Sequence, residues 1–203
     1  MIENKLGITS QVELAKEEEK ITKIKAIELF DTNKINEYEI GTFNGLSSIH
    51  KFLFNDIYSF AGKIREVNIA KGNFRFISYI YLKEVLNKID NMPQDNFENI
   101  IKKYAEMNIA HPFREGNGRS TRILLDMILK KEINKVVDWS KVNKEDYLLA
   151  MERSPIKDTE IKILLENVLT DKINDRQVFM KGIDASYSYE GYYAYKTEEL
   201  NNN

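Results

Sequence analysis

Apolar residues recur every three or four positions along most of this chain, and the period changes to alternation only once. A spacing of three or four places side chains on one face of an α-helix. Only 3 Pro and 9 Gly interrupt 203 residues, so few positions oppose helix formation. We therefore expect one all-α domain over residues 1–203, with helices at about 10–30, 46–60, 80–90, 96–110, 119–131, 144–152, 157–171 and 184–196.

Polar and small residues mark the expected limits of the first two helices. Ser10 followed by Glu13 has the pattern of a capping box, which predicts the start of the first helix. Ser47 and Ser48 are the cap candidates of the second helix, and Gly62 is expected to end it.

The alternating stretch covers about residues 64–77. Arg65, Val67 and Ile69 alternate with other residues, and after Lys71-Gly72-Asn73 the alternation resumes at Phe74. Two alternating runs joined by a short glycine-containing turn predict a β-hairpin. One small hairpin on a helical body is a flap rather than a sheet.

Charge and cysteine content exclude several classes of protein. The 30 basic and 32 acidic residues give a net charge of -2, which offers no basic excess for a nucleic-acid backbone. No run of about 18 apolar residues predicts a membrane span, and the first residues lack a signal-peptide pattern. The chain has no Cys, which excludes disulfides and cysteine-ligated zinc. We expect a cytoplasmic protein without direct nucleic-acid or membrane contacts.

The segment HPFREGNGRSTR, residues 111–122, carries the strongest chemical signal. Pro112 disfavours helical geometry at His111, so the preceding helix should end there and present the imidazole at the mouth of a loop. Gly116, Asn117 and Gly118 readily take positive φ and are expected to form an anion-binding nest of backbone N–H groups before the next helix.

Two arginines in the first turn of that next helix oppose its dipole, which predicts an anionic ligand. Arg119 and Arg122 share one helix face, and their guanidinium groups suit phosphate oxygens. Glu115 is either a salt-bridge partner or a ligand of Mg²⁺, and the sequence leaves both alternatives open. The Walker and Rossmann glycine patterns do not fit the segment. His50, within the second helix, is assigned a structural role.

The segment resembles the signature of the Fic family, HxFx(D/E)GNGRxxR, at every fixed position. AGKIREVNIAKGNFRF is similar to the family's AGxxR and flap, and SIHKFLFNDIYSFAG to the helix before them, so the resemblance covers roughly residues 45–200. It implies the Fido fold and transfer of AMP from ATP to a protein hydroxyl.

The resemblance also implies roles for individual residues. His111 resembles the general base, Phe113 a core anchor, Glu115 the Mg²⁺ ligand, and Arg122 the arginine that orients the γ-phosphate. Mn²⁺ and Ca²⁺ are alternative metals. The expected nucleotide-binding residues in the loop and the flap are Lys71, Gly72, Gly116, Asn117, Gly118, Arg119 and Arg122.

The tyrosine-rich tail contains SYSYEG, which resembles the family's inhibitory motif (S/T)xxxE(G/N). Its position resembles the compact bacterial type that carries its own inhibitor at the C-terminus, on a helix expected at about 184–196. In that type the glutamate, here Glu190 with Ser186, pairs with the second arginine, here Arg122. Whether Glu190 only inhibits or also supports AMP removal stays open, and Tyr187 is a candidate for self-modification.

Two alternatives to an adenylyltransferase remain at this stage. One is a Fic-fold transferase with phosphate or phosphocholine as the transferred group, and the other is a nucleotide-sensing module without catalysis. The partner is expected to be a protein with a Tyr, Ser or Thr hydroxyl; topoisomerase subunits are implied only by the resemblance. Assembly into homo-oligomers stays open.

Overall fold

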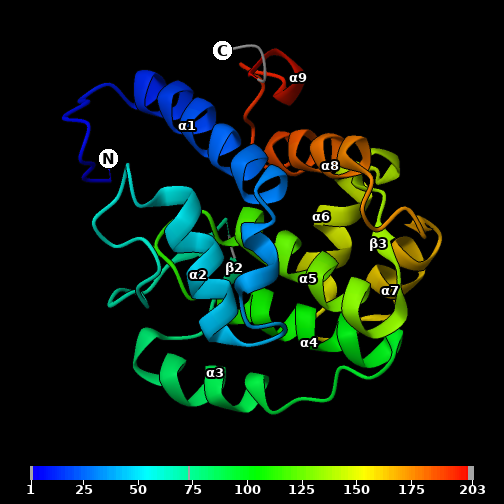
Figure 1. Cartoon of the computed structure of the whole chain (residues 1–203). Coiled ribbons are helices and arrows are strands. Elements are labelled where there is room, and N and C mark those ends of the chain that lie inside the picture. Colours follow the sequence, from blue (N-terminus) through cyan, green and yellow to red (C-terminus); the bar gives the residue numbers. More distant parts are fainter. Residues whose placement is uncertain (1, 73, 201–203) are drawn as a thin grey trace.

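Helices form most of the chain in the computed structural model, which describes residues 2–72 and 74–200 (Figure 1). The longer ones are α1 (Gln11–Asp31), α2 (Phe43–Phe54), α4 (Phe97–Ala110), α5 (Asn117–Ile133) and α8 (Arg176–Ser188). The shorter ones are α3 (Leu82–Asp90), α6 (Lys144–Arg153), α7 (Thr159–Glu166) and α9 (Thr197–Leu200), with 3-10 turns η1 (Lys34–Glu37), η2 (Tyr79–Tyr81) and η3 (Trp139–Lys141). The predicted all-α class is confirmed.

Helix α5 lies at the centre of the body and packs against α2, α4 and α8 (Figure 1). A helix that is apolar on all sides must be buried. The middle of α5 meets this condition, because its consecutive residues 123–125 and 127–129 are all buried apolar side chains. Burial of each large aliphatic side chain contributes about 1.5–3 kcal/mol. The N-terminus of α5, which carries the 111–122 segment, is therefore held firmly at the centre of the molecule.

The longest helix, α1, differs because it buries charged side chains. Glu18, Glu19 and Lys23 are each at most 2% exposed, on a helix that packs against α2, α8 and α9. This packing brings the first and last helices together (Figure 1). Across residues 2–72 and 74–200, no helix combines the length and apolar character that a bilayer crossing requires.

The start of α1 is as predicted, whereas the limits of α2 are not. Ser10 caps α1 by accepting the Glu13 N–H. Thr42, not Ser47 or Ser48, caps α2, because its hydroxyl accepts the Gly45 N–H at 3.2 Å. Helix α2 ends at Phe54 rather than near Gly62, and turns carry the chain through Ile57 to the glycine.

Two later helices also differ from expectation. The helix expected at 157–171 ends at Glu166, and β4 (Leu169–Thr170) pairs with β3 (Val136–Val137), a pairing that sequence periodicity missed because each strand has two residues. The helix expected at 184–196 is α8, which begins earlier because Asp175 accepts two N–H groups of its first turn. It ends at Ser188, so residues 190–196 are not helical.

The predicted flap is present and shorter than expected. Strands β1 (Ala70–Lys71) and β2 (Phe74–Arg75) are antiparallel, with Ala70 opposite Arg75 and Lys71 opposite Phe74. One further hydrogen bond, from the Phe76 N–H to the Ile69 carbonyl, extends the pairing. Asn73 of the expected turn lies outside the described residues.

Candidate active site

His111 ends helix α4 and takes a left-handed conformation, with φ of 47°. Pro112 explains why the helix stops there, as predicted. The imidazole stacks on Phe76 of the flap, with ring centroids 3.7 Å apart. Its Nδ1 lies 3.0 Å from the Asn108 carbonyl, which can only accept, so Nδ1 carries the proton. In the neutral ring, Nε2 is then the nitrogen with a free electron pair.

The surroundings of His111 keep that ring neutral near pH 7. Burial is the main cause that lowers the pKa of His111 to about 4; the charges of Arg65 and Lys71 act in the same direction, and the Asn108 carbonyl and Glu190 oppose them. A neutral imidazole with one free nitrogen can accept a proton from a hydroxyl. His111 therefore has the chemistry of a general base.

The glycine-rich turn forms an open helix start rather than the predicted three-residue nest. Only Gly116 has a positive φ, of 75°, whereas Asn117 and Gly118 already belong to α5. A Cβ at Gly116 would lie 2.4 Å from the Phe54 ring, so this position requires glycine. The Asn117 side chain bonds both the N–H and the carbonyl of Phe113, at 2.8 Å each, and fixes the loop.

The N-terminus of α5 is thereby suited to an anion. Gly116 provides no side-chain cap, so the first N–H groups of the helix keep their donor capacity. Phe113 is fully buried beneath this turn and stacks on His50, as expected for an anchor. His50 is structural, because its Nδ1 accepts the Gly62 N–H and its Nε2 donates to the Glu115 carbonyl.

Arg119 is fully buried and binds three carboxylates at once. Its Nη1 lies 2.6 Å from Glu18, its Nη2 2.9 Å from Glu115, and its Nε 2.9 Å from Glu190. Burial of an arginine requires such compensation. Glu18, which also accepts from Tyr58 and Tyr192, was not identified from the sequence.

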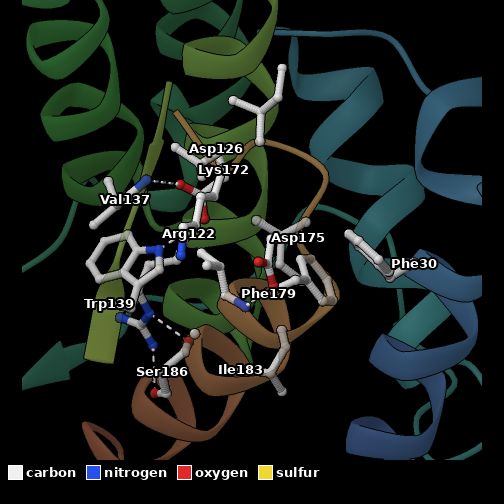
Figure 2. Close-up of a pocket in the computed structure, with 15 residues that line it drawn as sticks. Phe30, Arg122, Asp126, Val137, Trp139, Lys172, Asp175, Phe179, Ile183 and Ser186 are labelled. Carbon is white, nitrogen blue, oxygen red and sulfur yellow. Dashed lines mark hydrogen bonds between the residues drawn. The ribbon is translucent and has the colours of Figure 1, made fainter. Parts of the chain in front are cut away.

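Arg122 lies one helical turn further along α5 and contacts the tail. Its Nε donates to the Ser186 hydroxyl at 2.6 Å, and its Nη2 donates to the Ser186 carbonyl at 3.0 Å and to Glu190 at 2.7 Å. Figure 2 shows the Arg122–Ser186 bonds at the edge of a small pocket. The expected pair of Glu190 with Arg122 is present, but Glu190 bridges to Arg119 as well.

Glu190 is held as an ionised carboxylate. Burial alone would raise its pKa, but Arg119 and Arg122 together bring it below the ordinary value. A Cβ at Gly118 would lie only 2.4 Å from the Glu190 Oε1. Glycine at this position therefore lets the carboxylate approach the start of α5, where an anion is expected.

Glu115, the candidate metal ligand, forms an ion pair with Arg119 in this structure. Its side chain is 34% exposed, and burial raises its pKa, although Arg119 acts in the opposite direction. Among the described residues, no group of three or more His, Cys, Asp or Glu side chains could hold a metal by itself. Mg²⁺ often binds one or two carboxylates together with substrate phosphates. One partly exposed carboxylate beside an expected anion site fits that mode of binding.

The remaining predicted residues are divided between the flap and the tail. Lys71 and Gly72 lie at the exposed end of the flap, and Gly72 has a φ of 58°. Tyr187 is 1% exposed, with its ring against the Arg119 guanidinium. Two pockets lie near the site: one of about 40 Å³ beside Arg122, and one of about 410 Å³ between α1 and residues 191–194. His111 lines neither of them.

Comparison with known proteins places this geometry in a family. Residues 42–129 match the model of the Fic/DOC family. This region of the chain belongs to the Fic/DOC family. The protein adenylyltransferase VbhT of Bartonella schoenbuchensis is 28% identical over 89% of this chain and 40% of VbhT, so this Fic chain spans less than half of that relative. The probable protein adenylyltransferase Fic of Escherichia coli K12 is 26% identical over 62% of this chain and 68% of the relative.

A solved structure supports the Fic fold. BepC from Bartonella tribocorum, with bound AMPPNP, matches 84% of this Fic chain and 92% of its own, at 20% identity and a TM-score of 0.66. The family match at 42–129 includes the flap and the 111–122 segment. It includes neither Glu18 on α1 nor Glu190 in the tail, so two of the three carboxylates on Arg119 lie outside it.

Proposed function

We propose that this chain is a protein adenylyltransferase that transfers AMP from ATP to a hydroxyl of a protein. The observation that carries the proposal is the neutral His111, its Nε2 free, at the mouth of the loop that opens α5 with Arg119 and Arg122. The names of VbhT and the E. coli relative, and the AMPPNP bound to BepC, point the same way.

The proposed reaction joins the target oxygen to the α-phosphorus of ATP. His111 Nε2 takes the hydroxyl proton as the oxygen attacks, and the bond from the α-phosphorus to the bridging oxygen breaks. Pyrophosphate leaves. Arg119 and the free N–H groups of α5 would face the α- and β-phosphates, and Arg122 would orient the γ-phosphate.

Glu115 would hold Mg²⁺, with phosphate and water oxygens as the other ligands. The metal would neutralise charge on the phosphates. For Glu115 to do so, its contact with Arg119 must loosen. Mn²⁺ and Ca²⁺ are the alternatives to compare with Mg²⁺.

We also propose that the chain is autoinhibited, as in the Fic type with a C-terminal inhibitory motif. Glu190 occupies the guanidinium groups that ATP phosphates would need, and Ser186 fixes Arg122 in that arrangement. Use of the same carboxylate to direct water onto an AMP-modified target is a second role to test.

Self-modification would require release of the tail. Tyr187 is buried and becomes an acceptor only when the end of α8 leaves its place. A cytoplasmic location stays a prediction, and the identity of the target protein and assembly into homo-oligomers stay open.

The test is intact-mass analysis of lysate proteins and of the chain itself after incubation with ATP and Mg²⁺. We expect Glu190→Gly to add AMP and the double variant Glu190→Gly, His111→Ala to add none. Mass increments of phosphate, or no increment with any variant, would reject the adenylyltransferase in favour of the alternatives.

A further inference from the structure

We propose that Arg65 is a positioning residue for the reaction, which holds the general base His111 and both ends of the flap as one rigid unit. The proposal rests on the proposed role of His111. Arg65 is the arginine of the AGxxR stretch, and neither the 111–122 signature nor the proposed ATP cradle gives it a task.

Arg65 is 2% exposed and donates to the backbone on both sides of the site. Its Nε lies 2.8 Å from the His111 carbonyl, and its Nη2 3.2 Å from the Ala110 carbonyl. The Arg65 backbone N–H donates to the Pro112 carbonyl at 2.8 Å. Three successive carbonyl groups around the base are therefore fixed by one residue.

The same guanidinium also forms hydrogen bonds at both ends of the flap. Nη1 lies 2.6 Å from the Val67 carbonyl, before β1, and Nη2 also donates to the Ile77 carbonyl, after β2. Between these two contacts lies Phe76, whose ring stacks on His111. A shift of Arg65 would thus move the base, its stacking partner and the flap together.

The end of helix α4 explains why a buried cation is tolerated here. The last carbonyl groups of a helix lack intrahelical partners and carry the negative end of the dipole. Arg65 places its charge and donors at that end, on the Ala110 and His111 carbonyls. Five N–H donors in a rigid fork suit several fixed acceptors, which a lysine cannot reproduce.

Other groups also act on His111 and must be separated from Arg65. Glu190 of the tail and Lys71 of the flap are the other charges that affect the ring, and the Asn108 carbonyl fixes its tautomer. None of these groups holds the backbone of residues 110–112 among the described hydrogen bonds. Variants of Arg65 therefore test a distinct contribution.

The experiment compares Arg65→Lys and Arg65→Met, both in the Glu190→Gly chain, with Lys103→Met. Lys103 is a matched control, since it is 3% exposed and likewise donates to helix-end carbonyls, of Asp90 and Met92, away from His111. We expect kcat for AMP transfer to fall roughly tenfold or more in both Arg65 variants, with the Kd for ATP within about twofold. Lys103→Met should leave kcat within about twofold.

Nuclear magnetic resonance of the imidazole nitrogens gives a second readout without activity. The chain has 2 His, so His111 and His50 are readily told apart, and His50 is the internal reference. Arg65→Lys should change the His111 tautomer and ring signals and leave His50 unchanged. If Glu190→Gly itself transfers no AMP, the proposed function fails, while this measurement still decides the role of Arg65.

Two results would overturn the proposal. The first is unchanged His111 signals together with kcat within about twofold in Arg65→Lys. The second is a parallel loss of ATP binding, His50 signals and turnover in both Arg65→Lys and Lys103→Met, which would show a general effect on folding.

Discussion

Two buried cationic regions flank the start of α5, and they differ in the groups that bind them. On the flap side, the partners of Arg65 are backbone carbonyls. On the tail side, Arg119 and Arg122 are bound by side-chain carboxylates, and one of these belongs to the C-terminal segment.

The difference separates permanent structure from exchangeable structure. The fold fixes the positions of backbone carbonyl groups, which carry no net charge. A phosphate therefore cannot replace them as the partners of Arg65 unless the chain unfolds. A carboxylate on a terminal segment can leave, and a phosphate oxygen can then take the same donors. In the proposed reaction, the flap side would fix the base His111, and the tail side would control access of the nucleotide.

The largest expected effect tests the flap side. In the Glu190→Gly chain, His111→Ala should lower AMP transfer by roughly 10²–10⁴-fold, because the base acts on the target hydroxyl. Binding of ATP, measured by calorimetry, should change by less than about twofold. Transfer near the parental rate would remove His111 from the mechanism and break the comparison.

The next effect tests whether the tail side really serves ATP. Arg122→Ala in the Glu190→Gly chain should lower transfer by about 10²-fold, since the γ-phosphate loses its guanidinium. The measurement is the initial rate of AMP incorporation from labelled ATP. An activity equal to that of Glu190→Gly alone would make Arg122 an inhibitory partner only.

Removal of the tail carboxylate should have the opposite sign. Glu190→Gly is expected to raise AMP transfer by about tenfold or more, because it removes the carboxylate that Arg119 and Arg122 share and that phosphate would have to displace. The exposed Glu198 of α9 offers a control, and Glu198→Gly should not change the rate. Equal, low incorporation of AMP by the wild type and both variants would show that the Glu190 carboxylate does not inhibit transfer.

A stability measurement sharpens the contrast between buried and exposed charges on α1. Glu18→Gln should lower the free energy of unfolding by about 1–3 kcal/mol, because it weakens a fully buried arginine contact. Glu28→Gln, which removes an exposed pair with Lys25, should change it by less than about 1 kcal/mol. Urea unfolding followed by Trp139 fluorescence measures both. Equal effects would contradict the proposed support of Arg119 by α1.

The last prediction concerns the pH dependence of stability. Burial lowers the pKa of His111 to about 4 and of His50 to about 3, against an ordinary value of 6.5. The unfolded chain therefore binds more protons below pH 6.5, and stability should fall as the pH drops from 6.5 towards 4. The imidazole signals of the folded protein should not titrate between pH 8 and 5. A midpoint near 6.5 for His111 would contradict its burial.

The sequence predicted the parts of the site that are local in the chain. Residues 111–122 contain the proposed base, the helix start and both arginines, so their spacing alone indicates phosphate chemistry. The flap was predictable from its alternation, although it pairs over fewer residues than the pattern suggests. The inhibitory role expected for Glu190 depends on a short motif, and its contact with Arg122 agrees with that motif.

The missed features depend on contacts between distant residues. Glu18 and Arg119 are separated by 101 positions, and nothing in a charged helix distinguishes one glutamate that will be buried. The bond from Arg65 to His111 spans 46 positions and ends on a backbone carbonyl, which leaves no pattern in the sequence. The predicted starts of α2 and α8 were wrong for a similar reason. Their capping residues, Thr42 and Asp175, lie outside the apolar repeats from which the helices were predicted.

The position of Glu190 in the same polypeptide as Arg122 also determines how the proposed inhibition responds to amount. Inhibitor and enzyme are synthesised in a fixed one-to-one ratio, and the encounter between them is intramolecular, with an effective concentration set by the chain rather than by the cell. Dilution or changes in expression would then leave the inhibited fraction unchanged. Activation would have to come from a change in the tail itself or from a ligand that competes for the two arginines.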